Sequence, residues 1–186
     1  MANTVSNVAV GKPAITGVLW VADAGTTAPT DATTTLGASF KCLGYVSSDG
    51  LTNGMETDTT EIKAMGGDTV YTGNNGKTIT WQGTLIEILN TDVLKTVFGA
   101  ANVSGTLSTG ITLTVNNQEP DAHVVVVELV LRDAIKRVVL PNAKVSEVGD
   151  ITYTDDEVVG YETTFTCMPD SSGNMQYEYI EEASES

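Results

Sequence analysis

The segment closest to a reactive-site motif is a glycine-rich stretch that ends in Gly76-Lys77-Thr78. A phosphate-binding loop ends this way because its backbone N–H groups and its lysine cradle phosphate oxygens at the start of a helix. The full pattern needs a glycine five residues before Gly76, where this chain has Tyr71, and the residues after Thr78 read as a strand. We therefore interpret residues 73–78 as a hairpin turn.

Other candidate reactive side chains lack partners at a recognisable spacing. The single histidine, His123, has no serine, cysteine or ligand partner in such a pattern, and we expect it to be structural. The acidic turns at 155–157 and 170–174 lack the ligand series of a calcium loop. Cys42 and Cys167 are interpreted as two free thiols rather than a bridge. The sequence predicts no catalytic residue, no metal and no cofactor.

Basic residues are concentrated around Asp133, where Arg132, Lys136 and Arg137 supply three of the nine lysines and arginines. One interpretation is an anion or partner site. The alternatives are pairing across the strands of a hairpin or with the acidic surface of a neighbouring copy. We expect pairing with a neighbour.

The composition and charge limit the classes of protein to which this chain can belong. The 186 residues, 41% hydrophobic and 18% charged, predict one folded domain over 1–186. A net charge of −15 argues against a protein that wraps nucleic acid, because neutralising phosphates requires basic surface. Neither a signal peptide nor an apolar run long enough to span a bilayer is expected.

Abundant threonine, valine and glycine favour a mainly β fold. Residues 77–89 and 161–167 alternate between apolar and polar side chains, so each predicts a strand with one wet face. The apolar run 124–131 predicts a central strand. Further strands are expected at 17–22, 40–46, 111–115, 135–140 and 150–153.

One short α-helix is expected at about 90–98. Asn90 or Thr91 is a suitable N-cap, and Gly99 supplies the stop. The apolar stripe of this segment predicts that it covers one open end or face of the sheets.

Three other regions do not resemble core. They are an N-terminal arm at 1–14, a long polar loop at 47–68 and an acidic tail at 177–186. Structureless loops longer than about 15 residues are usually functional or disordered. We expect these segments to become ordered on a neighbouring subunit.

Phrases distributed along nearly the whole chain, in the same order, resemble the major tail tube protein of long-tailed siphophages. They lie at 28–34, 43–53 (LGYVSSDGLTN), 62–64, 66–70, 84–87, 102–107, 109–112, 136–144 (KRVVLPNAK), 160–164 and 168–170.

The resemblance implies a β-sandwich or barrel-like tail tube fold whose hexameric rings stack into a hollow tube in the virion tail. It further implies assembly in the host cytoplasm, the tape measure protein in the lumen, and terminator and distal tail or tail tip proteins at the two ends. Double-stranded DNA would pass through transiently and without specific contacts.

Within that implied tube, the wet strand faces are assigned to the lumen, because a polar or negative wall does not retain DNA. The assigned lumen residues are Thr78, Thr80, Gln82, Thr84, Glu162, Thr164 and Thr166. The residues assigned to contacts between subunits or rings are Asp49, Leu51, Asn53, Glu56, Ile62, Lys63, Asp68, Arg132, Lys136 and Arg137.

Three alternatives remain open. A tail terminator or head-to-tail joining protein of the same fold is the nearest. An immunoglobulin-like adhesion domain explains the strands but not the long interior polar stretch. An enzyme is the weakest alternative, because no nucleophile, base and oxyanion donor come together in the pattern.

Overall fold

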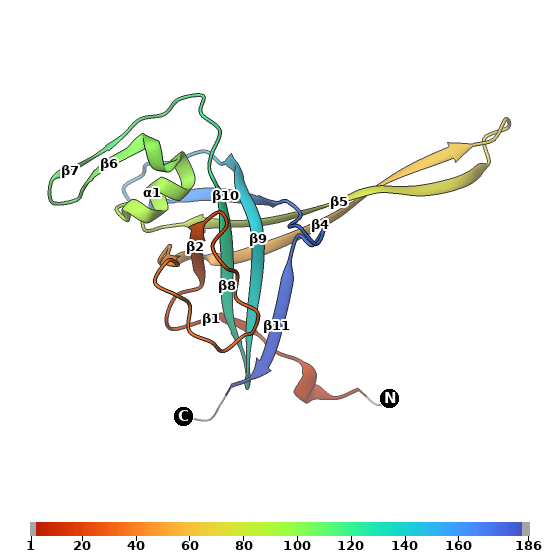
Figure 1. The fold of residues 1–186 in the computed structure, drawn as a ribbon, viewed down its shortest axis with the longest axis horizontal. Coiled ribbons are helices and arrows are strands. Elements are labelled where there is room, and N and C mark those ends of the chain that lie inside the picture. The colour runs from red at the N-terminus through yellow and green to blue at the C-terminus, as the bar shows by residue number, and fades with distance from the viewer. Residues whose placement is uncertain (1–2, 184–186) are drawn as a thin grey trace.

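The fold, taken from a computed structural model that describes residues 3–183, is organised around the hairpin of β8 (Ala122–Leu131) and β9 (Ala134–Val148) (Figure 1). The four valines at 124–127 are each at most 1% exposed. Both faces of β8 are thus covered, as the apolar run predicted for a central strand. The hairpin turns at Arg132 and Asp133, which lie between the paired residues Leu131 and Ala134.

Within residues 3–183 the main sheet is antiparallel and runs in the order β3-β2-β8-β9-β10-β5-β4, with β1 paired to β8 and β11 to β9. This confirms the predicted mainly β fold, although the sheet remains open at β3 and β4 and does not close into a barrel. The small sheet consists of β6 (Val103–Thr106) and β7 (Gly110–Leu113). The other strands are β1 (Gly11–Pro13), β2 (Leu19–Asp23), β3 (Lys41–Cys42), β4 (Val46–Lys63), β5 (Thr69–Leu85), β10 (Tyr161–Cys167) and β11 (Tyr177–Glu182).

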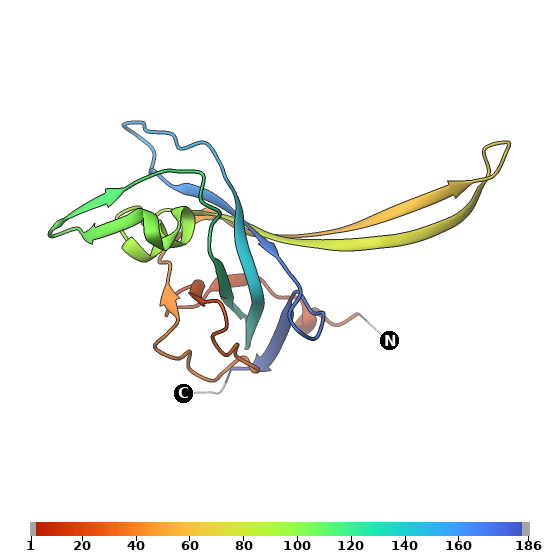
Figure 2. The ribbon, with the colours of Figure 1, turned by 45° about the horizontal axis from the view of Figure 1, so that its top comes forward.

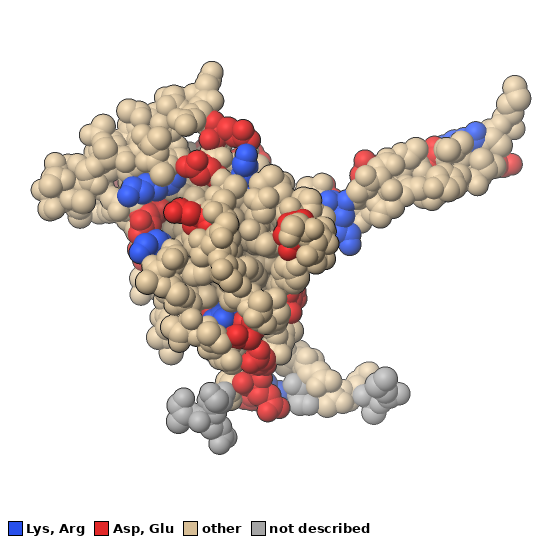
Figure 3. Space-filling model, in the orientation of Figure 1, with Lys and Arg blue, Asp and Glu red and all other residues tan. Residues whose placement is uncertain are grey.

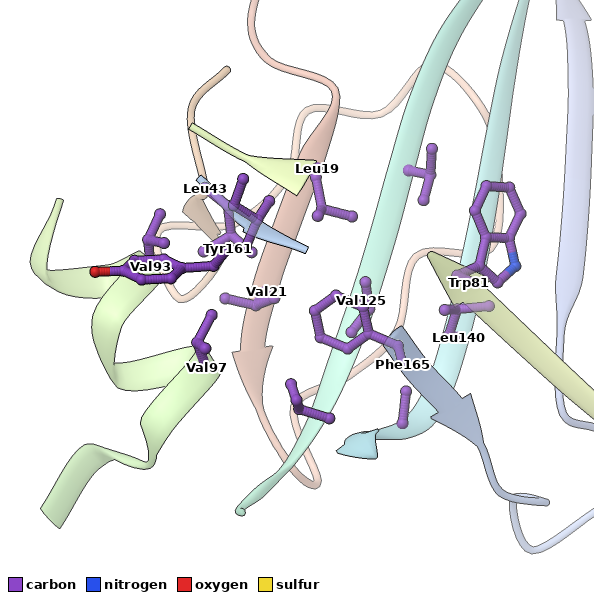
Figure 4. Close-up of a cluster of buried hydrophobic side chains, with 14 of the residues drawn as sticks. Leu19, Val21, Leu43, Trp81, Val93, Val97, Val125, Leu140, Tyr161 and Phe165 are labelled. Carbon is purple, nitrogen blue, oxygen red and sulfur yellow. The ribbon is translucent and has the colours of Figure 1, made fainter. Parts of the chain in front are cut away.

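The predicted helix is α1 (Thr91–Phe98), and it covers one side of the larger hydrophobic core. The Asn90 side chain caps it by accepting a hydrogen bond of 3.0 Å from the Asp92 amide, and it ends at Gly99 with φ 92°. Val93 and Val97 point toward the core near Tyr161 (Figure 4). Two 3₁₀ turns, η1 (Val5–Asn7) and η2 (Ala100–Asn102), complete the helical elements of the described residues.

Residues 47–63 of the expected long loop at 47–68 instead belong to the strand β4, which has three shifts in its register with β5. β4 pairs with β5 along nearly its whole length, and the two project from the body as a long hairpin (Figures 1 and 2). Every residue from Glu56 to Lys63 is exposed. The expectation was wrong because residues 56–63 pair with β5 without a buried face, so this part of the strand carries no apolar alternation.

The terminal segments are more ordered than the sequence suggested. Gly11–Pro13 of the predicted arm pairs with β8, and Tyr177–Glu182 of the predicted acidic tail pairs with β9. Residues 1–2 of the arm and 184–186 of the tail lie outside the described residues. The strand predicted at 150–153 does not form: β9 ends at Val148, the Gly149 amide still bonds to Glu162 O of β10 at 2.8 Å, and residues 150–153 are irregular.

Candidate functional site: a polar sheet face and a projecting hairpin

The seven side chains predicted to be wet lie on one face of the sheet, which we call the polar sheet face. Residues directly opposite each other in neighbouring strands point to the same side. The β5–β10 register places Thr84 opposite Glu162, Gln82 opposite Thr164 and Thr80 opposite Thr166. Thr78 continues the same alternation on β5, and these side chains are exposed or half-buried. The opposite side of both strands is core, where Ile79, Trp81, Leu85, Tyr161, Phe165 and Cys167 are buried.

Side-chain hydrogen bonds tie the polar sheet face together. Gln82 Nε2 donates to Glu162 Oε1 at 2.7 Å, diagonally across the β5–β10 pair. At a register shift between β9 and β10, Thr166 Oγ1 donates to Ser146 Oγ at 2.7 Å, and Ser146 Oγ donates to Thr164 O at 3.2 Å. The hydroxyl groups thus satisfy one another and the backbone that the bulge leaves unpaired.

The face extends beyond the two strands identified in the sequence. On β4, Glu56 lies opposite Thr78, so a residue predicted for subunit contacts shares the predicted lumen face. On β9, Lys144 lies opposite Thr166, and its ammonium group contacts Glu119 Oε1 at 2.7 Å. That hydrogen bond lowers the pKa of the Glu119 carboxyl. The alternation at 143–146, Ala-Lys-Val-Ser, could have identified the β9 part of the face.

The basic residues near Asp133 have partners within the chain. Lys136 Nζ lies 2.7 Å from Glu178 Oε2 of β11, and the exposed Arg132 lies 3.4 Å from Asp133. The predicted role of Lys136 and Arg132 at a subunit interface stays a prediction. Figure 3 shows the acidic side chains that gather on this part of the surface near β11.

Arg137 differs, because it is only 3% exposed and lies inside the fold. Its Nε donates to Glu128 Oε1 at 3.0 Å, and its Nη1 donates to Asp31 O at 2.9 Å. The expectation that Arg137 pairs with a neighbouring subunit is therefore corrected. The partner of Arg137 is instead Glu128, which lies opposite it on the neighbouring strand. The contact with Asp31 holds the loop 24–40 over a second, smaller core of Ala22, Phe40, Val124, Val126 and Val139.

The hairpin of β4 and β5 carries large apolar side chains that face solvent. Ile62 is 53% exposed and lies opposite Tyr71, which is 60% exposed, while Met65 in the turn is fully exposed. Lys63 and Asp68 lie at the same end. At the base of the hairpin, Leu51 packs partly against the core, and Asn53 and Asp49 bond to Gln176 and Ser47 respectively.

The surroundings of the histidine and of the two cysteines indicate structural roles. His123 is 8% exposed, and neither ring nitrogen has a hydrogen-bond partner among the described residues. Burial lowers its pKa, against the opposing charges of Asp121 and Asp23. Cys42 and Cys167 are both free thiols, and burial raises the pKa of Cys167 to about 12. In the part of the chain that the structure describes, no helix is both long and apolar enough to cross a membrane.

Two of three comparisons with known proteins gave a match. A sequence profile of the phage tail tube protein family matches residues 1–186. The comparison with curated proteins gave no match. Among solved structures, the chain is similar to the tube-terminating cap of the anti-feeding prophage, determined by cryo-EM, with a TM-score of 0.42 and 13% identity over 98% of this chain and 100% of that chain.

Proposed function

The chain belongs to the phage tail tube protein family, and from that premise we propose that it forms hexameric rings that stack into the hollow tail tube of a long-tailed phage. Membership makes it a structural protein of the virion tail. The observation that carries the proposal is the family match over the whole chain, residues 1–186. The exposed edge of β4 is compatible with it, because head-to-tail pairing around a closed rotation covers open sheet edges.

In this proposal the polar sheet face lines the lumen. It is supported by the continuity of hydroxyl, amide and carboxylate groups from β4 to β9. Its Glu56 and Glu162 are acidic, and its Lys144 is paired with Glu119. DNA carries about one negative charge per 1.7 Å of helix axis, so a basic wall would hold it through many salt-sensitive contacts. A neutral or acidic wall lets DNA pass.

The proposed partners follow from the tube. Copies of this chain are the main partner, the tape measure protein occupies the lumen before ejection, and terminator and distal tail or tail tip proteins close the ends. Assembly takes place in the host cytoplasm, and contact with DNA is transient.

Negative-stain electron microscopy of the purified chain, over a range of concentrations and incubation times, tests the proposal. Hollow filaments with a regular axial repeat are the expected result. Isolated rings that never stack would contradict it and favour the joining protein. A three-dimensional reconstruction of the filaments then tests the assignment of the polar sheet face to the lumen. The assignment is wrong if Thr80, Gln82 and Glu162 face the outer surface of the tube.

A further inference from the structure

The sequence contains two Asn-Gly pairs, Asn53-Gly54 and Asn75-Gly76, and both lie on the projecting hairpin of β4 and β5. An asparagine before a glycine readily loses its side-chain amide, because glycine has no side chain to keep its backbone nitrogen away from the asparagine Cγ. The two atoms meet where the backbone opens locally, and a packed, paired strand opposes that opening. The two pairs differ in both respects.

The fold holds Asn53 by its backbone and by its side chain. Gly54 lies opposite Thr80 in a stretch of the β4–β5 ladder without a register shift, and a Cβ at Gly54 would lie 2.5 Å from Thr80 Oγ1. Asn53 is half-buried, and its Nδ2 donates to Gln176 Oε1 at 2.8 Å. A rotation that brought Asn53 Cγ onto the Gly54 nitrogen would break both the ladder and this side-chain bond.

Asn75 instead lies at an exposed bulge. This segment, interpreted from the sequence as a hairpin turn, lies within β5. The register places Gly76 opposite Asp58 and Asn74 opposite Thr59, so Asn75 has no opposite residue within the described strands. Asn74, Asn75 and Gly76 are all exposed, and a Cβ added at Gly76 would meet no described atom within 4 Å.

Two side-chain contacts restrain this second pair. The Gly76 amide donates to Asn74 Oδ1 at 2.9 Å, and Asn75 Nδ2 donates to Thr60 Oγ1. Both contacts are exposed, so water competes for their donors and acceptors and each contributes little to stability. Breaking them requires only the rotation of surface side chains, with no loss of packing.

We propose that Asn75 is a site of spontaneous deamidation, opened when the Gly76 amide leaves Asn74 Oδ1. The Gly76 nitrogen attacks Asn75 Cγ, the bond from Cγ to Nδ2 breaks, and ammonia leaves with the proton of the Gly76 amide. Water, the only co-reactant, then opens the resulting succinimide ring at one of its carbonyl carbons. The product is aspartate or isoaspartate, with no oxidation or reduction, while the ladder protects Asn53.

The product changes the charge and the pairing of the hairpin. A carboxylate in place of the Asn75 amide can no longer donate to Thr60 Oγ1, and it adds a negative charge close to Asp58 of the opposite strand. The isoaspartate product also inserts a methylene group into the backbone of β5. An aged chain therefore differs from a newly made one at this bulge.

Peptide mass spectrometry of the folded full chain, incubated in mildly alkaline buffer below the concentration at which it assembles, tests the proposal. Asn75 is expected to convert at least about tenfold faster than Asn53, because local opening frees the bulge and not the ladder. In urea, where the ladder is lost, the two rates should agree within about twofold. Equal rates in the folded chain would overturn the proposal, and so would conversion of both pairs in urea but of neither in the folded chain.

Variants test the geometry of the bulge. Asn74→Ala removes the acceptor of the Gly76 amide and should speed conversion at Asn75 several-fold; an unchanged or lower rate would overturn the proposed opening step. Thr52→Ala makes the matching change before Asn53 and should leave both rates unaltered, since Gly54 stays in the ladder.

A further variant identifies the reacting side chain. Asn75→Gln keeps the amide but moves its carbonyl carbon one bond farther from the Gly76 nitrogen, so it should abolish conversion at this position. Conversion that persists in Asn75→Gln would contradict attack by the Gly76 nitrogen. All of these measurements use unassembled chain, so their outcome is independent of the proposed tube.

Discussion

Glu128 and Arg137 lie directly opposite each other in the β8–β9 ladder, and the Arg137 Nε donates to Glu128 Oε1 at 3.0 Å inside the fold. Arg137 is 3% exposed and Glu128 is 8% exposed. Neither charge is solvated by bulk water, so each depends on the other for compensation. Because Arg137 also bonds to Asp31 O, the pair connects the centre of the sheet to the loop 24–40.

Removing one charge of this pair should be costly. Arg137→Ala is expected to lower the free energy of unfolding by about 3 to 5 kcal/mol, because it leaves Glu128 buried and unpaired. Urea denaturation followed by circular dichroism measures the change. Lys136→Ala is the control, since its partner Glu178 lies at the surface, and it should cost at most about 1 kcal/mol.

The double variant Arg137→Met/Glu128→Leu separates pairing from packing. It removes both charges but keeps apolar volume, so its loss should be much smaller than that of Arg137→Ala. An equal or larger loss in the double variant would show that the ion pair is not what the single substitution disrupts.

Arg132 carries backbone strain at the tip of the same hairpin. Its φ of 52° lies in the left-handed region that glycine adopts without cost. Arg132→Gly should therefore raise the free energy of unfolding by about 0.5 to 1 kcal/mol, since the exposed pair with Asp133 contributes little.

The same variant tests the predicted role of Arg132 between subunits. A more stable chain that no longer assembles would place Arg132 at an interface. Normal filaments from Arg132→Gly would remove it from the predicted set of contact residues.

Elements with one buried face could be predicted from the sequence because burial imposes a period. The alternation at 161–167 and the apolar stripe of Val93, Leu94 and Val97 located β10 and α1. In β5, the same signal placed Gln82 and Trp81 on opposite sides of the sheet. The candidate lumen residues were gathered onto one face by that period alone.

Two features could not be predicted in this way. The hairpin strand β4 has exposed residues on both sides over 56–63, so its pairing with β5 leaves no apolar period in the sequence. The environment of Arg137 depends on its opposite neighbour Glu128, and strand register is not visible in a local run of residues. Sequence reasoning therefore assigned Arg137 to a surface when it belongs to the interior.

The charge of the polar sheet face should control DNA passage. Glu162 is exposed, so the Glu162→Lys variant is expected to assemble. Phage carrying this variant should release DNA several-fold more slowly at low salt than at high salt, because the introduced lysines would contact DNA phosphates. Release can be followed with a DNA-binding dye after triggering ejection. Glu157→Lys, in an exposed turn, makes the same charge change and should leave release unaltered. Equal release in both variants would argue against a lumen position for Glu162.

His123 should make the fold sensitive to mild acid. Burial lowers the pKa of His123 below its ordinary value of 6.5, against the opposing pull of Asp121 and Asp23. The folded state therefore binds this proton less readily than the unfolded state, so protonation of His123 costs no stability at a pH well above 6.5. Stability should fall as the pH drops below 6.5 and level off only below the folded pKa.

Denaturation curves at pH 7.5, 6.5 and 5.5 for the natural chain and for His123→Leu measure this effect. The substitution should flatten the pH dependence of the free energy of unfolding across that interval. Asp31 and Glu119, whose pKa values are lowered, affect stability only at a pH nearer their ordinary pKa values of 3.8 and 4.5. Those two carboxyl groups keep their charge in the interval, so neither of them accounts for a slope there. An unchanged slope in His123→Leu would mean that another group titrates there, and that the buried imidazole is reached by water in solution.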